Sequence, residues 1–218
     1  MSKHRHIIDT FRSATPSERT RGELWYHTAR LSALELTALS GHGPHEPWSI
    51  DQAACVIAAL SPQNKWSRNL EDAQAVARWY ASPEPVSERT PPATATYDWC
   101  RDRALQAATD SRDPWAALGD GRKTKDFARL IANPNQPYVV CIDRHAYRIF
   151  RGEAPGDTRV SKSDYRAARL AYFDAAEQIN REHGFSLASP LLACQIQSIT
   201  WLAYRRQHGI SKVKEEKK

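Results

Sequence analysis

The segment 53–60, Ala-Ala-Cys-Val-Ile-Ala-Ala-Leu, has an apolar or small side chain at every position and constrains the fold more than any other part of the chain. A helix formed here has no polar side to turn toward water, so it must lie in the middle of a core with other elements around it. Ser49 or Asp51 can cap its start, and the segment 61–66 interrupts it. We therefore expect this helix to lie in the middle of the core.

Apolar residues recur at helical intervals along most of the remaining chain. This spacing predicts helices over 17–40, 67–81, 95–109, 113–118, 122–132, 162–183 and 188–207. A proline-rich loop is expected over 83–92, and an extended run over 138–142 leads into a further helix that begins at Asp143. We predict an all-α fold with almost no strand, and we find no internal repeat.

The composition indicates an ordinary globular protein. Of the 218 residues, 41% are apolar and 26% charged, which suits one large domain or two small lobes. No apolar run is long enough for a membrane span, and the N-terminus lacks the apolar stretch of a signal peptide. We therefore expect no membrane partner and a cytoplasmic location.

The spacing of the four cysteines bears on metal binding, and the net charge bears on nucleic-acid binding. Cysteines 55, 100, 141 and 194 are too far apart for typical zinc or iron–sulfur spacing, so we expect buried, reduced thiols and no metal site. The net charge of +6 fits binding to nucleic-acid phosphates, although many basic proteins bind no nucleic acid. Part of the charge lies in residues 211–218, which we predict to be a disordered basic tail.

A glycine turn opens the helix predicted over 122–132. Gly119 and Gly121 lie on either side of one residue, so successive backbone N–H groups can point the same way, and the helix start adds its positive dipole end. Lys123 stands in the first turn of that helix. This arrangement suits a phosphate clamp, and the alternative is a plain turn between helices.

Asp143 follows the apolar run 139–142, so its carboxylate should emerge from the wall of the core. As an N-cap it would accept hydrogen bonds from helix N–H groups. A fixed carboxylate beside a cleft can stabilise an oxocarbenium-like sugar cation or activate a water or an amine. The alternative is a purely structural cap.

Taken together, the run Leu-Gly-Asp-Gly-Arg-Lys-Thr, the helix and apolar stretch after it, and Ile-Asp-Arg-His-Ala-Tyr-Arg resemble the helix-hairpin-helix (HhH-GPD) DNA glycosylases of the endonuclease III type. That family shows Leu-Pro-Gly-Val-Gly-Arg-Lys-Thr-Ala, then Val-Asp-Thr-His with an arginine three residues on. The hairpin here is one residue shorter and lacks the proline. Residues 57–63, with Asn69 and Ala73, look like the family's Leu-Leu-Ser-Ala-Gln segment, so the resemblance covers about 50–151.

The resemblance implies a two-lobed helical fold with a cleft between the lobes, in a single domain over 1–210. The lobe with the hairpin would span about 50–151, and the N-terminal and C-terminal helices would form the other lobe. Asp143 matches the catalytic aspartate and Lys123 the Schiff-base lysine, although a small register shift would make Lys125 the functional amine.

The resemblance also assigns the DNA contacts. Gln63 matches the glutamine that wedges into the duplex, and Gly119 and Gly121 match the hairpin that holds a backbone phosphate, often with a monovalent cation. The family's iron–sulfur site has no counterpart here. Further DNA contacts are predicted for Arg122, Thr124, Lys125, Asn64, Lys65, Arg144, His145 and Arg148. A base pocket of Trp66, Tyr26 and Trp25 is the remaining prediction, with core packing as its alternative.

Three functions fit these residues. The first is a DNA N-glycosylase that flips a modified or damaged base from double-stranded DNA, with Lys123 adding a lyase activity. The second is a transferase on the same fold that attaches amino acids or amines to hypermodified thymines, as relatives in phages are thought to do. The third is a DNA-binding module without chemistry. An aspartate and a lysine at both catalytic positions argue against the third, and we expect a monomeric glycosylase acting in a nucleoid or in the cytoplasm of a phage-infected host.

Overall fold

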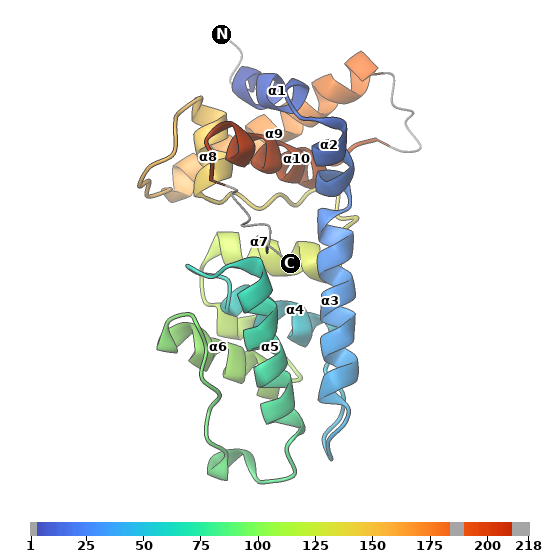
Figure 1. Cartoon of the computed structure of the whole chain (residues 1–218), viewed down its shortest axis with the longest axis vertical. Coiled ribbons are helices and arrows are strands. Elements are labelled where there is room, and N and C mark those ends of the chain that lie inside the picture. Colours follow the sequence, from blue (N-terminus) through green and yellow to red (C-terminus); the bar gives the residue numbers. More distant parts are fainter. Residues whose placement is uncertain (1–3, 184–189, 211–218) are drawn as a thin grey trace, which may run out of the picture. The chain divides into compact units, whose positions relative to one another are not determined.

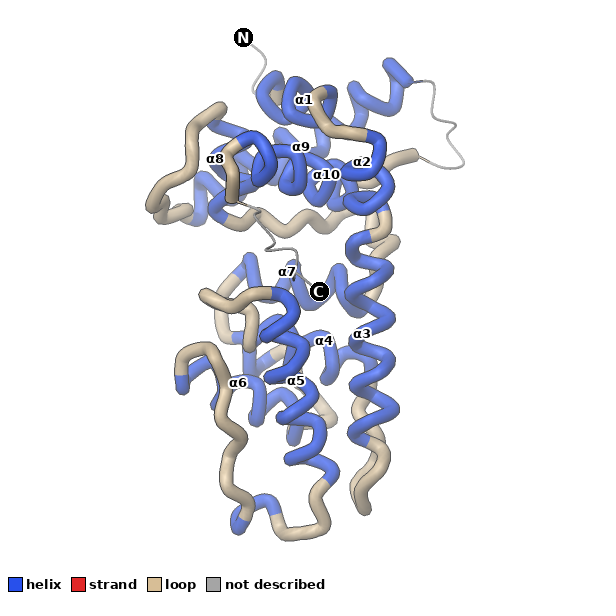
Figure 2. The backbone as a smooth tube through the Cα atoms, in the orientation of Figure 1, coloured by secondary structure: helices blue, strands red, loops and turns tan. Residues whose placement is uncertain are grey.

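The computed structural model describes residues 4–183 and 190–210, and this part of the chain is all-helical (Figure 2). It contains ten α-helices and two short 3₁₀ turns, and no strand occurs among the described residues. The all-α prediction is therefore confirmed. The predicted tail 211–218 and the first two residues of the helix predicted over 188–207 lie outside the described residues.

The chain divides into two compact units, each with its own core. Unit 1 combines Met1–Trp25 with Asn135–Lys218, and unit 2 is the continuous segment Tyr26–Pro134. The helix that begins after Asp143 therefore belongs to the unit of the two chain ends, whereas the sequence groups it with the hairpin. Lys123 belongs to unit 2.

Unit 2 is built around α4 (Ile50–Ala59), the segment that is apolar on every side (Figure 1). Residues 52–60 are all buried, as the pattern predicts. Ser49 caps the helix as expected, because its hydroxyl accepts from the backbone N–H of Gln52 and the Gln52 side chain accepts in return from the N–H of Ser49. The remaining elements of the unit are α3 (Trp25–Ser40), α5 (Trp66–Ala81), η1 (Val86–Glu88), α6 (Asp98–Thr109), η2 (Ala116–Leu118) and α7 (Arg122–Ala132).

Unit 1 is built around α10 (Ala193–Gln207), which contacts all the other helices of the unit. Gly22 makes one of these contacts possible, because a Cβ atom on it would lie 2.6 Å from the backbone of Ile199. Only glycine lets the two helices approach this closely. The other helices are α1 (Arg5–Arg12), α2 (Pro16–Glu23), α8 (Arg144–Arg151) and α9 (Lys162–His183).

Several expected boundaries are wrong. The helix predicted over 17–40 is two helices, since α2 ends at Glu23 and α3 begins at Trp25. The apolar spacing continues across this break and gives no sign of it. The sequence analysis also missed α1, whose apolar residues Ile7, Ile8 and Phe11 are buried in the core of unit 1.

Two other predicted segments are shorter than expected. Of 95–109 only Asp98–Thr109 is α-helical, and of 113–118 only a 3₁₀ turn forms. The proline-rich loop 83–92 is confirmed as mostly irregular and is held by the buried Arg89. Its guanidinium donates to the backbone carbonyls of Trp79, Tyr80, Ser82 and Glu84.

Candidate active site

Asp143 caps α8, as predicted, and both of its carboxylate oxygens are held. Oδ1 accepts a hydrogen bond from the backbone N–H of Ala146 at 2.7 Å. Oδ2 accepts one from the indole N–H of Trp201, on α10, at 3.1 Å. The residue remains partly exposed. The carboxylate is thus fixed in orientation while keeping access to solvent.

Trp201 is itself held in place by a cation. The guanidinium carbon of Arg205, one helical turn further along α10, lies 4.3 Å from the centre of a Trp201 ring. Burial lowers the pKa of Arg205, and the nearby Asp143 carboxylate opposes this effect. The two side chains place an indole and a positive charge beside the carboxylate.

His145, the second residue of α8, is half-buried near the same side chains. Its Nδ1 atom is buried and makes no hydrogen bond within the described part of the chain. Its ring centre lies 5.9 Å from that of Tyr204. Burial lowers the pKa of His145 and neighbouring arginines lower it further, whereas Asp143 raises it. His145 therefore favours its neutral form.

The two predicted phosphate-binding arginines of α8 have different surroundings. Arg144 is exposed at the first position of the helix. Arg148 instead holds the loop after α8, since its guanidinium donates to the backbone carbonyls of Ala154 and Asp157 and lies 3.9 Å from the Glu153 carboxylate. Its contact with phosphate remains a prediction, and its structural role is evident.

The two glycines of the hairpin are not equivalent. Gly119 has φ +59° and ψ −150°, a conformation that is essentially restricted to glycine. Gly121 has φ −68°, which any residue can adopt, and a Cβ atom on it would meet no atom closer than 3.5 Å. The hairpin therefore needs a glycine at position 119 and only tolerates one at position 121.

The helix that follows the hairpin starts without a side-chain cap. Its N-cap residue is Gly121, which has no side chain to bond to the first N–H groups of α7, and the first turn contains no acidic residue. Arg122 is exposed at its first position, and Lys123, Thr124 and Lys125 are half-buried. A basic, uncapped helix N-terminus attracts anions.

The three residues of the predicted base pocket do not all pack together. Tyr26, which is buried, and Trp66, which is half-buried, each contact Phe127 edge-on, with ring centres 6.4 Å apart in both pairs. Phe127 stands one helical turn after Lys123, so the two share one side of α7. Trp25 is half-buried at the start of α3 and belongs to unit 1.

The segment before α5 contains a backbone feature that the sequence does not reveal. Gln63 is exposed and has φ +56°, the one positive φ among the described residues other than glycine. Asn64 is engaged locally, because its side-chain amide donates to the Leu60 carbonyl and to the Asp72 carboxylate. Lys65 is exposed at the N-cap position of α5.

Sequence reasoning missed the α10 part of the site. Trp201, Tyr204 and Arg205 reach the Asp143 region from more than fifty residues away, so no local motif connects them. The one available signal is their spacing of three to four residues, which places them on one side of a helix. Gln195, near the start of the same helix, bonds within the fold: it accepts from the N–H of Leu192 and donates to the carbonyl of Glu23.

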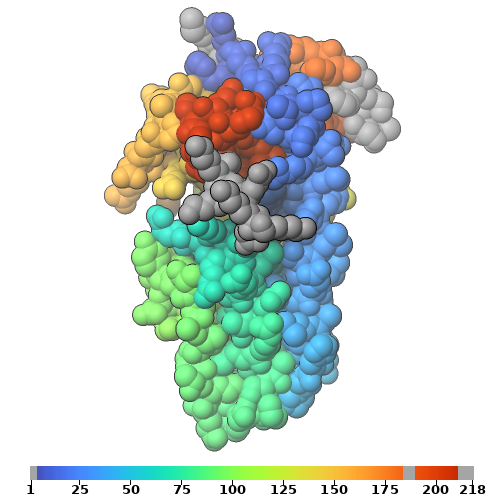
Figure 3. Space-filling model, viewed as in Figure 1, coloured from blue at the N-terminus to red at the C-terminus, as the bar shows by residue number. Residues whose placement is uncertain are grey.

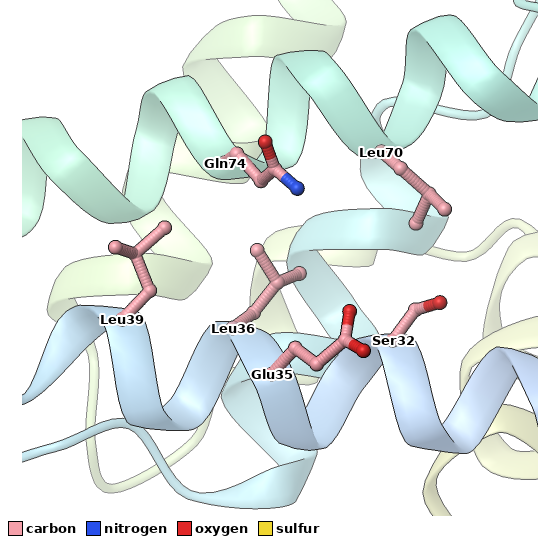
Figure 4. Close-up of a pocket in the computed structure, with 6 residues that line it drawn as sticks. All are labelled: Ser32, Glu35, Leu36, Leu39, Leu70 and Gln74. Atoms are coloured by element: carbon pink, nitrogen blue, oxygen red, sulfur yellow. The ribbon is translucent and has the colours of Figure 1, made fainter.

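A small pocket in unit 2 is lined by residues of α3 and α5. The surfaces of these two helices adjoin in Figure 3. Leu36 and Leu39 of α3 point toward Leu70 and Gln74 of α5 (Figure 4). The volume of about 50 Å³ is well below the ~300 Å³ at which ligand pockets begin. This pocket is too small to hold a nucleoside.

Within the described residues, no cluster of histidine, cysteine and acidic side chains could bind a metal ion. All four cysteines are buried and form no disulfide, as predicted. The described helices include none with the length and apolar character needed to cross a membrane.

Comparison with known proteins gives one match. Searches of the curated proteins and of the solved structures found no similar protein. Residues 2–208 match the model of a protein family described as a family of unknown function, DUF7178. Because this match covers nearly the whole chain, the protein belongs to the DUF7178 family.

Proposed function

We propose that this protein is a DNA N-glycosylase of the two-lobed helix-hairpin-helix type, in which Asp143 supports cleavage of the bond between a flipped base and its sugar. The observation that carries the proposal is the double hydrogen bonding of Asp143. A structural cap needs only the bond to the helix N–H. The second bond, from the Trp201 indole, orients the other oxygen and is expected where a carboxylate must face a reacting atom.

The hairpin supplies the DNA contact in this proposal. The uncapped start of α7, with Arg122 and Lys123 in its first turn, binds a backbone phosphate through N–H groups and positive charge. The resemblance adds a monovalent cation at this turn, where the Gly121 carbonyl is already engaged by the N–H of Lys125. Such an ion would screen the phosphate charge.

The reaction follows from the chemistry of the two residues. The bond between C1′ of the sugar and the base nitrogen breaks, and the base leaves with the electron pair. The Asp143 carboxylate stabilises the positive charge that develops on the sugar. Either water or the Lys123 amine then attacks C1′. Attack by the amine forms an N–C1′ bond and the nitrogen loses a proton; the C1′–O4′ bond then breaks, O4′ takes up a proton, and a Schiff base results. Loss of a proton from C2′ then expels the 3′ phosphate by breaking the C3′–O bond, which cuts the strand.

One part of the division of the chain supports this proposal, namely the unit formed by the two chain ends. Unit 1 forms from both ends of the chain and contains Asp143, whereas unit 2 contains the hairpin and Lys123. A lobe made from the N-terminal and C-terminal helices is what the resemblance leads us to expect. The positive φ of the exposed Gln63 also supports the proposal, since strained backbone often accompanies a residue with a binding role.

A substrate panel tests the proposal. The purified protein is incubated with duplexes that contain uracil, thymine glycol, 8-oxoguanine, hydroxymethyluracil or a hypermodified thymine. We expect abasic sites in at least one duplex, and a borohydride-trapped protein–DNA adduct that Lys123→Ala abolishes. A heavier base in an intact strand would instead identify a base-modifying transferase. Binding without either product would identify a DNA-binding module.

A further inference from the structure

Two exposed aromatic side chains lie next to each other in unit 2. Tyr97 is 51% exposed and Trp99 is 50% exposed. Their ring planes are within 10° of parallel, and the ring centres are 6.1 Å apart. Large aromatic side chains are normally buried for most of their area, so a parallel pair in contact with water indicates a surface made for a flat partner.

Arg103 connects this pair to the hairpin. Its guanidinium carbon lies 5.0 Å from the centre of a Trp99 ring, one helical turn back along α6. Its Nη2 atom lies 3.2 Å from the position that a Cβ atom on Gly119 would occupy. The aromatic pair, the arginine and the Gly119 turn therefore form one continuous surface of unit 2.

The charge that lies directly against the aromatic pair is the positive charge of Arg103. On the neighbouring side of α6, Asp98 and Asp102 are each paired with Arg101 at 3.0 Å. Arg103 makes no ion pair within the described part of the chain, so its charge is available to a ligand. The basic start of α7 continues the positive charge beyond Gly119.

A nucleobase attached to a phosphate meets both requirements. Its flat face stacks on Tyr or Trp rings, and its phosphate is attracted to arginine. In a fully paired duplex both faces of each internal base are covered by its neighbours. Only an unpaired base, in a single strand or a bubble, presents a free face to an exposed ring.

We propose that Tyr97, Trp99 and Arg103 form a stacking surface for unpaired bases of a DNA strand, and that the preferred substrate therefore contains unpaired bases. This inference rests on the proposed function for the choice of DNA as the ligand. It adds a substrate class that the hairpin and Asp143 do not specify.

The test compares two labelled oligonucleotides by fluorescence anisotropy with the full-length protein. One is oligothymidine, and the other is an abasic strand of equal length with the same phosphates and no bases. The protein should bind oligothymidine more tightly, and Trp99→Leu should weaken that binding about ten-fold while leaving the affinity for the abasic strand unchanged. Trp99→Phe, which keeps a ring, should retain most of the affinity.

Charge variants on the same helix provide the matched control. Arg103→Gln should weaken binding to both strands, whereas Arg101→Gln removes the same charge from the neighbouring side and should have little effect. Equal affinity for the two strands, no binding to either, or no effect of Trp99→Leu would overturn the inference. Trp99-dependent binding without base release from any DNA would support the inference and reject the glycosylase. Base release that does not depend on Trp99 would support the glycosylase and overturn the inference.

Discussion

At position 143 the carboxylate is held by two donors from different helices, and the second donor is the informative one. The Ala146 N–H belongs to the helix that Asp143 caps. The Trp201 indole belongs to α10, and Arg205 packs against its ring. Trp201 is therefore a positioning residue in our account: it acts on the substrate only through Asp143.

Trp201→Phe keeps an aromatic ring for Arg205 and removes the N–H donor to Asp143. A hydrogen bond to a charged group is worth about 1.5–3 kcal/mol, so single-turnover base release should slow by roughly ten-fold to a hundred-fold. DNA affinity should not change, because the indole donates to Asp143. Rapid-quench assays and anisotropy titrations measure the two quantities.

Trp115→Phe is the matched control for this change. It removes a bond of the same kind in unit 2, between the Trp115 indole and the Asp51 carboxylate at 3.3 Å. Base release should remain at the wild-type rate in this variant. If the two variants lose activity equally, the effect is general destabilisation and the positioning role of Trp201 is wrong.

His145 gives a prediction for pH. Burial lowers its pKa from the ordinary value of 6.5, and nearby arginines lower it further against the opposing effect of Asp143. As the pH falls below 6.5, the unfolded chain binds a proton at this residue before the folded chain does. The free energy of unfolding should therefore decrease as the pH falls through this range.

His145→Asn should make that decrease less steep. Urea unfolding of both proteins at a series of pH values measures the slopes, and the comparison removes the contribution of the other histidines. Parallel slopes for wild type and variant would show that the folded protein does not hold His145 in its neutral form.

Asp143 could be identified from the sequence because it stands between an apolar run and a helix, and both signals are local. Trp201 and Arg205 could not be identified in this way. They reach the site through the packing of α10 in unit 1, and their own surroundings in the sequence contain no motif. The positive φ at Gln63 could not be predicted either, because among residues other than glycine this conformation is uncommon and is enriched mainly in asparagine, aspartate and histidine.

Among the structural elements, the hairpin offers the sharpest comparison, since its two glycines differ in conformation. Gly119→Ala forces a side chain into a conformation that is essentially restricted to glycine, and should cost about 1–3 kcal/mol of unfolding free energy. Gly121→Ala meets neither strain nor a close contact, but alanine is a poorer N-cap than glycine, so this change should cost no more than about 1 kcal/mol. Denaturant unfolding distinguishes the two.

The same pair of variants distinguishes an effect on stability from an effect on DNA binding. If the hairpin binds a backbone phosphate, Gly121→Ala should weaken DNA binding although it costs little stability, because the added methyl group covers the exposed start of α7. Unchanged DNA affinity in a stable Gly121→Ala protein would contradict the proposed role of the hairpin.

The helix prediction succeeded where the apolar spacing stops at both ends of the helix. The helix predicted over 162–183 is α9 with the same bounds. The helix prediction failed at Leu24, because the apolar spacing continues without a break from the end of α2 into the start of α3. It also failed for α1, whose short apolar set becomes meaningful only once it packs against the rest of unit 1.

At the scale of the whole molecule, the two proposed activities belong to different units. Asp143 lies in unit 1 and Lys123 in unit 2. The sequence places 135–151 with the hairpin because they are neighbours in the chain. In the structure, α8 packs its buried residues Ala146, Tyr147 and Ile149 into the core formed by the chain ends. Chain continuity therefore could not reveal which core the helix joins.

The most direct measurement follows base release by wild type, Asp143→Asn and Lys123→Ala on the best substrate of the panel. Asparagine keeps an oxygen that can cap α8, so the variant should fold and bind DNA. Its base release should fall by about a hundred-fold or more. Lys123→Ala should lose only the trapped adduct and strand cleavage. Base release at the wild-type rate by a folded Asp143→Asn protein would contradict the central claim that this carboxylate drives the chemistry.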